Sequence, residues 1–109
     1  MNPNQYRLWP IGSIDLAAGG TTPALELKFQ HSWSISPVIT GTSGSATYTM
    51  EVSHDNSEWK EYKDGSTTVN IDDAIQDDLI PWAYIRIVVT PGGGSSGSVD
   101  FNLMTKSPS

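Results

Sequence analysis

Strict alternation of apolar and polar residues marks the most regular segment of the chain, SATYTMEVS at residues 45–53. This period of two is the pattern of a strand with one buried face, because successive side chains of a strand point to opposite sides. The buried face would carry Ala46, Tyr48, Met50 and Val52. The segment ALELKFQ, residues 24–30, repeats the pattern with Leu25, Leu27 and Phe29. Both segments are therefore predicted to be strands.

The segment SWSISPVITGT, residues 32–42, is also expected to be a strand. One face would carry Trp33, Ile35 and Ile39, and Val38 is out of step with them. Pro37 has no backbone N–H to donate to a neighbouring strand, which indicates an edge position or a bulge.

Three more segments complete the predicted strands. The run WAYIRIVVT, residues 82–90, is rich in β-branched and aromatic residues and is predicted to be a central strand. Residues 98–104, SVDFNLM, would close the fold with one apolar face made by Val99, Phe101 and Leu103. Near the start of the chain, Ile11 and Ile14 indicate a short strand.

In the segment HDNSEW, residues 54–59, His54 to Ser57 are predicted to form a hairpin turn after the most regular strand. Asp55 and Asn56 favour a turn, because Asp and Asn tolerate left-handed backbone and bond their own backbone. Trp59 would open the returning strand, close to the inward residues of its partner. We expect its ring to fill the end of a sandwich.

Only residues 72–81, DDAIQDDLIP, have a helical pattern, and they would make one or two turns. Their apolar residues, at near-helical spacing, are Ala74, Ile75, Leu79 and Ile80. Pro81 would end the helix. The segment PGGGSSGS, residues 91–98, is predicted to be a flexible loop.

About seven to eight short strands separated by turns are typical of a sandwich or a barrel. No long helix is available to connect parallel strands. The sequence therefore predicts an all-β fold, a single antiparallel β-sandwich of jelly-roll, immunoglobulin-like or discoidin-like type. The sandwich domain would span residues 13–104, between an N-terminal arm at residues 1–12 and a flexible tail at residues 105–109.

The charge and the cysteine content of the chain exclude several kinds of partner and site. The 109 residues include 6 Lys and Arg against 12 Asp and Glu, which gives a net charge of -6. Phosphate backbones and anionic lipids attract basic proteins, so neither nucleic acid nor a membrane surface is expected as a partner. The lack of cysteine excludes disulfides and thiolate metal sites. No long apolar run is present, so we predict neither a membrane protein nor a conventional secreted precursor.

Residues with catalytic or metal-binding chemistry are few. His31 and His54 are the only imidazoles, and neither has a second ligand at zinc-site spacing. The aspartates of residues 72–78 could offer oxygens to Ca²⁺, but the D-x-[DN]-x-[DN]-G pattern is missing and a solvated acidic loop explains them better. No serine has a G-x-S-x-G context. The glycines at 92–94 lack the Gly-Lys-Ser/Thr of a phosphate loop. We therefore expect that the protein is not an enzyme and that it binds no metal and no cofactor.

The strand and turn MEVSHDNSEW and the later run AYIRIVV resemble discoidin-like domains. Those domains carry an S-x-D-G-x-x-W turn and a later R-Y-I-R-I strand. The matching residues here are Ser53, Asp55, Asn56, Trp59, Tyr84, Ile85, Arg86 and Ile87. Asn56 stands where Gly is usual, a reasonable exchange at a left-handed position.

Over nearly its whole length, the sequence resembles small virion proteins of tailed bacteriophages. The resemblance rests on four segments in order, SIDL, FQHSWS, GTSGSATYTMEVSHDNSEW and AYIRIVVTPGGGSSGSVDFNL. It implies a β-sandwich that sits on the virion, often as a capsid decoration or other accessory protein. The shared positions are structural in character, so no set of functional residues is carried over.

The expected function is that of a non-enzymatic structural protein of a phage virion, which decorates or stabilises the capsid from outside. Its partner would be the major capsid protein or another virion protein, and it would form a homo-oligomer, with a trimer as the expected state. Candidate interface residues in the arm are Tyr6, Leu8 and Trp9. Candidate ligand or interface residues elsewhere are Trp82, Arg86 and His54. The alternative is a discoidin-like carbohydrate-binding module for host adhesion, with a glycan near Trp9, Trp82 and His54.

Overall fold

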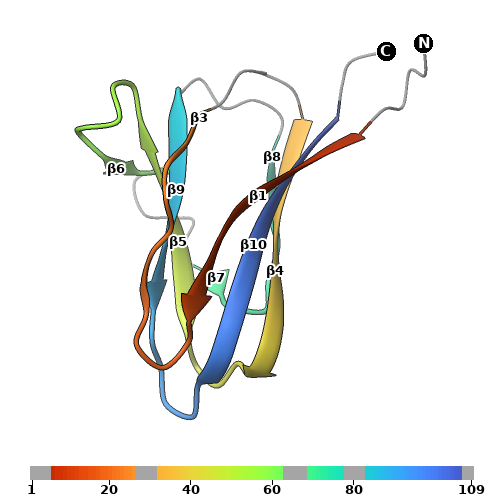
Figure 1. Ribbon diagram of the computed structural model, residues 1–109, viewed down its shortest axis with the longest axis vertical. Helices are drawn as coiled ribbons and strands as arrows, with labels where there is room; N and C mark the ends of the chain where they lie inside the picture. The colour runs from red at the N-terminus through yellow and green to blue at the C-terminus, as the bar shows by residue number, and fades with distance from the viewer. Residues whose placement is uncertain (1–5, 27–31, 63–68, 78–82, 107–109) are drawn as a thin grey trace.

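The computed structural model describes residues 6–26, 32–62, 69–77 and 83–106. These residues form ten strands and no α-helix, arranged as two antiparallel sheets that pack face to face (Figure 1). The predicted fold class, an all-β antiparallel sandwich, is confirmed. The strands outnumber the expected seven to eight because four of them are only two residues long.

The sheet called sheet A below has the strand order β1-β10-β4-β8. Its three long strands pair along most of their length, and the short β8 pairs only with one end of β4. The first and last strands of the described chain are thus neighbours. The bounds are β1 (Tyr6–Asp15), β10 (Ser96–Lys106), β4 (Ser32–Thr42) and β8 (Ile75–Asp77).

The other sheet, sheet B, has the order β2-β9-β5-β6, with β3 also paired to β9 and β7 to β5. Its centre is the pair β5 and β9, which is in register from Thr47 and Thr90 to Ser53 and Tyr84. The predicted central position of the AYIRIVVT run is confirmed. The bounds are β2 (Gly20–Thr21), β3 (Leu25–Glu26), β5 (Thr47–Ser53), β6 (Lys60–Glu61), β7 (Val69–Asn70) and β9 (Tyr84–Thr90).

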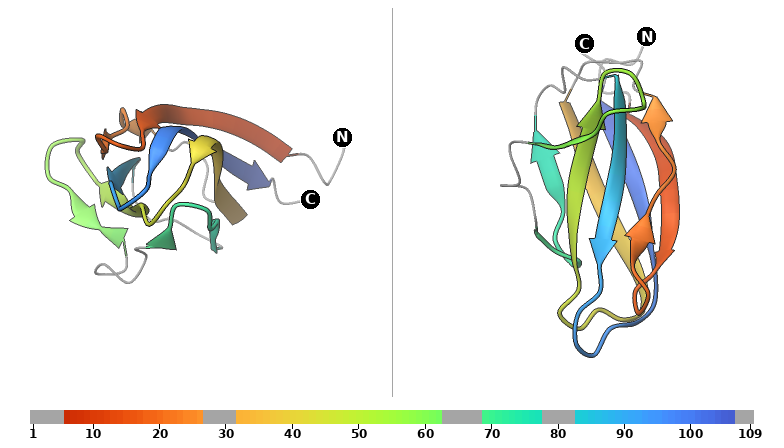
Figure 2. Two further views of the ribbon diagram at one scale, coloured as in Figure 1. Left: turned by 90° about the horizontal axis from the view of Figure 1, so that it is seen from below. Right: turned by 90° about the vertical axis from the view of Figure 1, so that its left-hand side faces the viewer.

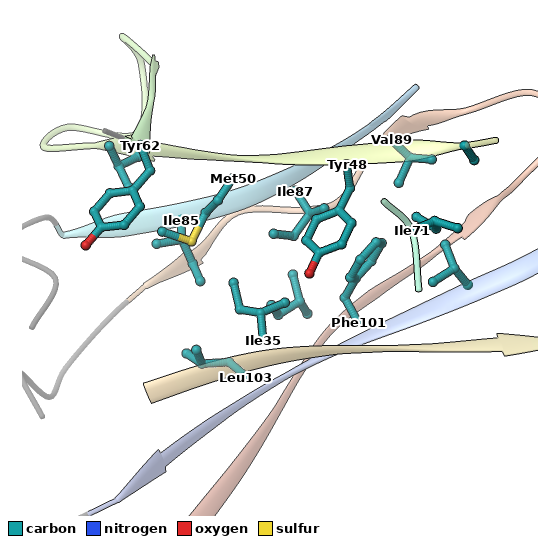
Figure 3. Close-up of a cluster of buried hydrophobic side chains, with 14 of the residues drawn as sticks. Ile35, Tyr48, Met50, Tyr62, Ile71, Ile85, Ile87, Val89, Phe101 and Leu103 are labelled. Carbon is teal, nitrogen blue, oxygen red and sulfur yellow. The ribbon is translucent and has the colours of Figure 1, made fainter. Parts of the chain in front are cut away.

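The core lies between the two sheets and is built from the inward positions of their long strands (Figure 3). Each fully buried aliphatic side chain here contributes about 1.5–3 kcal/mol relative to exposure. The inward residues of β5 are those that the alternation over residues 45–53 predicted, so this prediction is confirmed. Inward residues of sheet B include Tyr48, Met50, Val52, Ile85 and Ile87, and those of sheet A include Ile35, Val99, Phe101 and Leu103.

Tyr48 brings a polar group into this core. Its ring packs against Phe101 with the centroids 5.0 Å apart, and its hydroxyl donates a hydrogen bond to the carbonyl oxygen of Asp73 at 2.5 Å. Burial, with the nearby charge of Asp73 as a second cause, raises the pKa of Tyr48 above its ordinary value. The phenol therefore stays protonated and keeps its hydrogen bond.

The surroundings of strand β4 explain the two irregularities of its sequence, Val38 and Pro37. Val38 lies on the outer face of sheet A and is 53% exposed, because the alternation continues unbroken through the strand. Pro37 pairs with Phe101 on one side, while β8 pairs with β4 only from Trp33 to Ile35. Past the end of β8, a backbone N–H toward that side is not needed. The predicted edge position of Pro37 is confirmed locally.

Strand β1 includes much of the segment expected to form an N-terminal arm. Residues 6–10 and Gly12 pair with β10, so the expected boundary after residue 12 falls inside a sheet strand. The register shifts between Pro10 and Gly12, which is a bulge. This extra residue lets Ile11 and Ile14 both face the core at a spacing that simple alternation would not allow. At the other end, β10 continues to Lys106, into the predicted tail.

The prediction of a helix over residues 72–81 is wrong in its described part. Residues 75–77 form strand β8, in which Ile75 pairs with Ile35 and Asp77 with Trp33. Pairing with β4 satisfies backbone groups that a helix of one or two turns would leave largely open at its ends. Tertiary pairing therefore overrides a weak helical spacing.

The Gly- and Ser-rich segment at residues 91–98 is only partly a loop, because β10 already begins at Ser96. Gly97 has a φ of +90°, and a Cβ at this position would collide with the carbonyl oxygen of Thr40. Glycine is thus required both for the backbone conformation and for the close approach of β4. The turn before it is tied to the neighbouring loop, where the Ser95 hydroxyl donates to the Ser43 carbonyl at 2.7 Å.

The predicted strand at residues 24–30 is described only in part. Leu25 and Glu26 form β3, and Leu25 packs against the core. The other predictions that lie outside the described residues concern Leu27, Phe29, His31, Leu79, Ile80, Pro81 and Trp82.

Candidate functional site

The hairpin between β5 and β6 is the most elaborate turn of the described chain. The Asp55 carboxylate accepts hydrogen bonds from the backbone N–H groups of Ser57 at 2.9 Å and Glu58 at 3.0 Å, and from the Ser53 hydroxyl at 3.1 Å. The Ser53 oxygen in turn accepts the N–H of Asn56 at 2.9 Å. Asn56 has a φ of 62°, the left-handed conformation that its position requires. Asp55 thus accepts hydrogen bonds within the turn, and Asn56 supplies its left-handed backbone.

These hydrogen bonds set the charge of the turn. The backbone N–H of Glu58, then that of Ser57, then the Ser53 hydroxyl hold the pKa of Asp55 below its ordinary value of 3.8. The carboxylate is therefore ionised at neutral pH and serves as an acceptor within the turn. A shallow hollow beside it is lined by His54, Asp55, Glu58 and Lys60.

The sequence led us to expect that Trp59 would fill the end of the core, but it does not. It is half-buried, and its ring lies against the guanidinium of Arg86, which is 4.2 Å from the ring centroid. Arg86 points to the outer face of sheet B, where its Nε–H also donates to Glu51 at 2.6 Å. The hairpin passes over one end of β9, which brings Trp59 onto this face (Figure 2, right).

The core position expected of Trp59 is taken by other aromatic residues. Trp33 is 4% exposed, and its ring meets that of Tyr62 edge to face with the centroids 5.8 Å apart. Trp59 faces outward because it precedes Lys60, which pairs with the inward-facing Val52, and side chains alternate along the strand. The displacement of Trp59 to the outer face is thus a consequence of hairpin register.

This cluster holds two strands and the hairpin together. The Arg86 guanidinium is a permanent cation and is already engaged by Glu51 and Trp59. Within residues 6–26, 32–62, 69–77 and 83–106, no three His, Asp or Glu side chains are grouped so that they could hold a metal ion. Over the same residues, no helix has the length and apolar character to span a bilayer.

The exposed large apolar side chains of the described residues lie on the opposite side of the molecule, on the outer face of sheet A. Leu8 is 60% exposed and lies directly opposite Met104, which is 40% exposed. Val38, two strands away from Leu8, lies on the same face. These three are the exposed large apolar side chains of the described residues.

The predicted site residues therefore divide between different parts of the fold. Leu8 is exposed as a candidate interface residue should be, whereas Trp9 is half-buried and packs against the core of its own domain. Tyr6 pairs with Lys106 at the end of β1. His54 is exposed at the hairpin, remote in the fold from Leu8. Trp82 lies outside the described residues.

Sequence reasoning did not name Val38 and Met104 as site residues. Val38 had a visible signal, since it was the apolar residue out of step in its strand. Met104 also follows from the alternation of Val99, Phe101 and Leu103, which assigns it to the outer face. That both lie on the same face as Leu8 follows only from the strand order of sheet A.

Two solved structures share this fold over most of the chain. The SPBc2 prophage-derived protein YomS has a TM-score of 0.70 at 10% sequence identity, with 98% of this chain and 97% of that chain covered. The Yersinia pseudotuberculosis-derived mitogen (YPM) has a TM-score of 0.53 at 12% identity, with 94% of this chain and 86% of that chain covered. At such identities the similarity shows the fold, an antiparallel β-sandwich. No protein-family model and no curated protein sequence matches the chain.

Proposed function

We propose that this chain is a non-enzymatic structural protein of a phage virion, which binds the outside of the capsid and decorates or stabilises it. The observation that carries the proposal is the fold similarity to YomS, a prophage-derived protein, over nearly the full length of both chains. The resemblance of the sequence to small virion proteins of tailed phages supports the same class. A fold by itself does not define a function, so the surface of the protein must also suit binding to a capsid.

The described surface favours contact with a protein. Leu8, Val38 and Met104 expose apolar side chains on the outer face of sheet A, and a sheet face fits another folded surface better than a small ligand, which binds in a concave site. The partner would be the major capsid protein or another virion protein. A capsid presents the same site many times, so that individually weak contacts are multiplied when the bound copies are linked.

The alternative, a discoidin-like carbohydrate-binding module, finds less support among the described residues. Sugar binding by stacking requires exposed aromatic rings. Trp33 is buried, Trp9 packs against the core, and one face of Trp59 is covered by Arg86. The exposed large apolar side chains of the described chain are all aliphatic or thioether groups.

Co-sedimentation tests the proposal. Purified protein is mixed with capsids assembled from the major capsid protein of the same phage genome and pelleted, with empty-tube and unrelated-capsid controls. We expect saturable binding at a fixed ratio to the capsid protein. Absence of binding over a range of salt and protein concentrations would contradict capsid decoration. Binding to immobilised glycans in the same preparation would then favour the carbohydrate-binding alternative.

A further inference from the structure

Strand β1 is an edge strand of sheet A and pairs with β10 on one side only. Its N-terminal half, residues 6–10, runs beside the end of β10 and extends beyond sheet B (Figures 1 and 2). No strand of the described chain pairs with the other side of these residues. The backbone groups on that side therefore form an open sheet edge, which is a template for a further strand.

The register shows which backbone groups point to this open edge. Leu16, directly after β1, donates its N–H to the carbonyl oxygen of Gly97 at 2.9 Å. In an antiparallel pair every second residue bonds to the partner strand, and the residues between them point their N–H and C=O to the other side. Counted in steps of two along β10 from Gly97, Leu103 also bonds to β1, where its partner is Trp9. Leu8, next to Trp9, therefore points both its N–H and its C=O to the open edge.

The other half of β1 is protected against an added strand. The register shift between Pro10 and Gly12 interrupts the edge. Gly12 then lies against the next segment of the chain, where a Cβ on it would approach Cδ of Pro23 to 3.0 Å. Bulges, prolines and covering segments are the usual protections of an edge strand. Residues 6–9 contain no proline and no bulge, and no described strand covers their open side.

We propose that the capsid protein contributes an extended segment that pairs with residues 6–10 of β1 as an added strand of sheet A. This inference rests on the proposed function, because it states how that partner is held. In such a contact the backbone hydrogen bonds supply affinity, and alternate side chains supply specificity. The side chain opposite Leu8 would cover a residue that is 60% exposed and lies beside Met104, so the added strand extends an exposed apolar corner.

The edge also specifies the chemistry of the added segment. Its side chains alternate between the two faces of sheet A, so one lies beside Leu8 on the outer face and the next beside the half-buried Trp9 on the inner face. We expect apolar residues at both positions. The residue that bonds to the C=O of Leu8 must have an N–H and is therefore not proline. The net charge of -6 on this chain favours a neutral or basic segment over an acidic one.

A proline substitution at the edge separates backbone pairing from side-chain contact. Co-sedimentation with capsids assembled from the major capsid protein is measured for the wild type, Leu8→Pro and Leu8→Ala. Leu8→Pro removes the N–H at the open edge and leaves the groups that face β10, which is the position where edge strands accept proline. Leu8→Ala is the matched control, since it also loses the leucine side chain but keeps the N–H. We expect Leu8→Pro to bind at least about tenfold more weakly than Leu8→Ala.

Hydrogen exchange of the wild-type chain gives a second readout that does not depend on any variant. The Leu8 amide points to the open edge, so it should exchange rapidly in the free chain. On capsids its exchange should slow by at least about tenfold, because the amide is then bonded to the added strand. The Trp9 amide faces β10 in both states and is the internal reference.

The outcomes distinguish this inference from the proposed function. If the wild type binds capsids, but folded Leu8→Pro and Leu8→Ala bind equally well, or the Leu8 amide exchanges as in the free chain, the added strand is overturned and capsid binding stands. A wild-type chain that binds no capsid would contradict the proposed function and this inference with it. Circular dichroism shows whether Leu8→Pro is folded, and if it is not, the exchange of the wild-type Leu8 amide decides.

Discussion

The guanidinium of Arg86 lies over the indole ring of Trp59, 4.2 Å from its centroid, and links the β5–β6 hairpin to the centre of sheet B. Arg86 is also paired with Glu51 on the neighbouring strand. The strand that Trp59 precedes, β6, has only two residues and little ladder of its own. The stacked pair is therefore a principal contact that holds the hairpin against the sheet.

A double-mutant cycle measures this contact. Trp59→Ala and Arg86→Met should each destabilise the fold, and their effects should be non-additive by about 1 kcal/mol, the range of a partly covered cation–π pair. Urea unfolding of the wild type, both single variants and the double variant gives the coupling. Glu51→Gln is the matched control, since it removes the ion pair but leaves the stack, and should cost about 0.5 kcal/mol. Fully additive effects of Trp59→Ala and Arg86→Met would show that the two side chains do not act together.

Tyr48→Phe removes the hydroxyl that bonds to the Asp73 carbonyl while keeping the ring in the core. We expect a loss of about 1 kcal/mol in the free energy of unfolding, the usual net value of a hydrogen bond. Tyr84→Phe, on the outward side of β9, should change stability by less than about 0.5 kcal/mol. Equal effects of the two substitutions would be inconsistent with a structural role for the Tyr48 hydroxyl.

The same residue predicts a loss of stability in alkali. The pKa of Tyr48 is raised in the folded state, so its contribution is present below the ordinary value of 10.0 and is lost as the pH rises through the folded value. Unfolding titrations above about pH 10 should show a steeper loss of stability for the wild type than for Tyr48→Phe. Parallel curves would argue against this shift.

The Asp55 turn predicts the opposite behaviour in acid. Its pKa is depressed in the folded state, so its stabilising contribution is present above the ordinary value of 3.8 and is lost as the pH falls through the folded value. Asp55→Asn keeps an acceptor but cannot titrate, so the free energy of unfolding should fall less steeply between about pH 5 and pH 2 than in the wild type. An unchanged acid slope would show that the carboxylate titrates alike in both states.

Asn56 tests the backbone requirement of the hairpin. Because its φ is 62°, Asn56→Val should destabilise the fold by about 1–2 kcal/mol, whereas Asn56→Gly should be neutral or mildly stabilising. Chemical denaturation separates the two outcomes. If both substitutions cost the same, the side chain of Asn56, and not its left-handed backbone, would be what matters.

The predictable part of this fold is the part governed by alternation. The inward and outward residues of β5 and the exposure of Val38 follow from a period of two, and the hairpin follows from the turn chemistry of Asp55 and Asn56. The other parts of the fold depend on pairing between segments that are far apart in the sequence. The bulge in β1 and the strand at Ile75 depend on β10 and β4, which are distant in the sequence.

The candidate site could likewise be predicted only in part from the sequence. Leu8 was chosen as an exposed apolar residue, and it is exposed. Trp9, beside it, was placed in the same arm but faces the core, because adjacent residues of a strand point to opposite sides. Only the strand order places Leu8, Met104 and Val38 on one face.

Quantitative mass spectrometry of gradient-purified phage particles tests the central claim most directly. If the chain is a capsid decoration protein, its peptides should remain with infectious particles through repeated gradients, at a constant ratio to the major capsid protein. The same particles stripped of the chain by mild denaturant should recover that ratio when purified chain is added back. Peptides present in the infected lysate but absent from the purified particles would contradict the account.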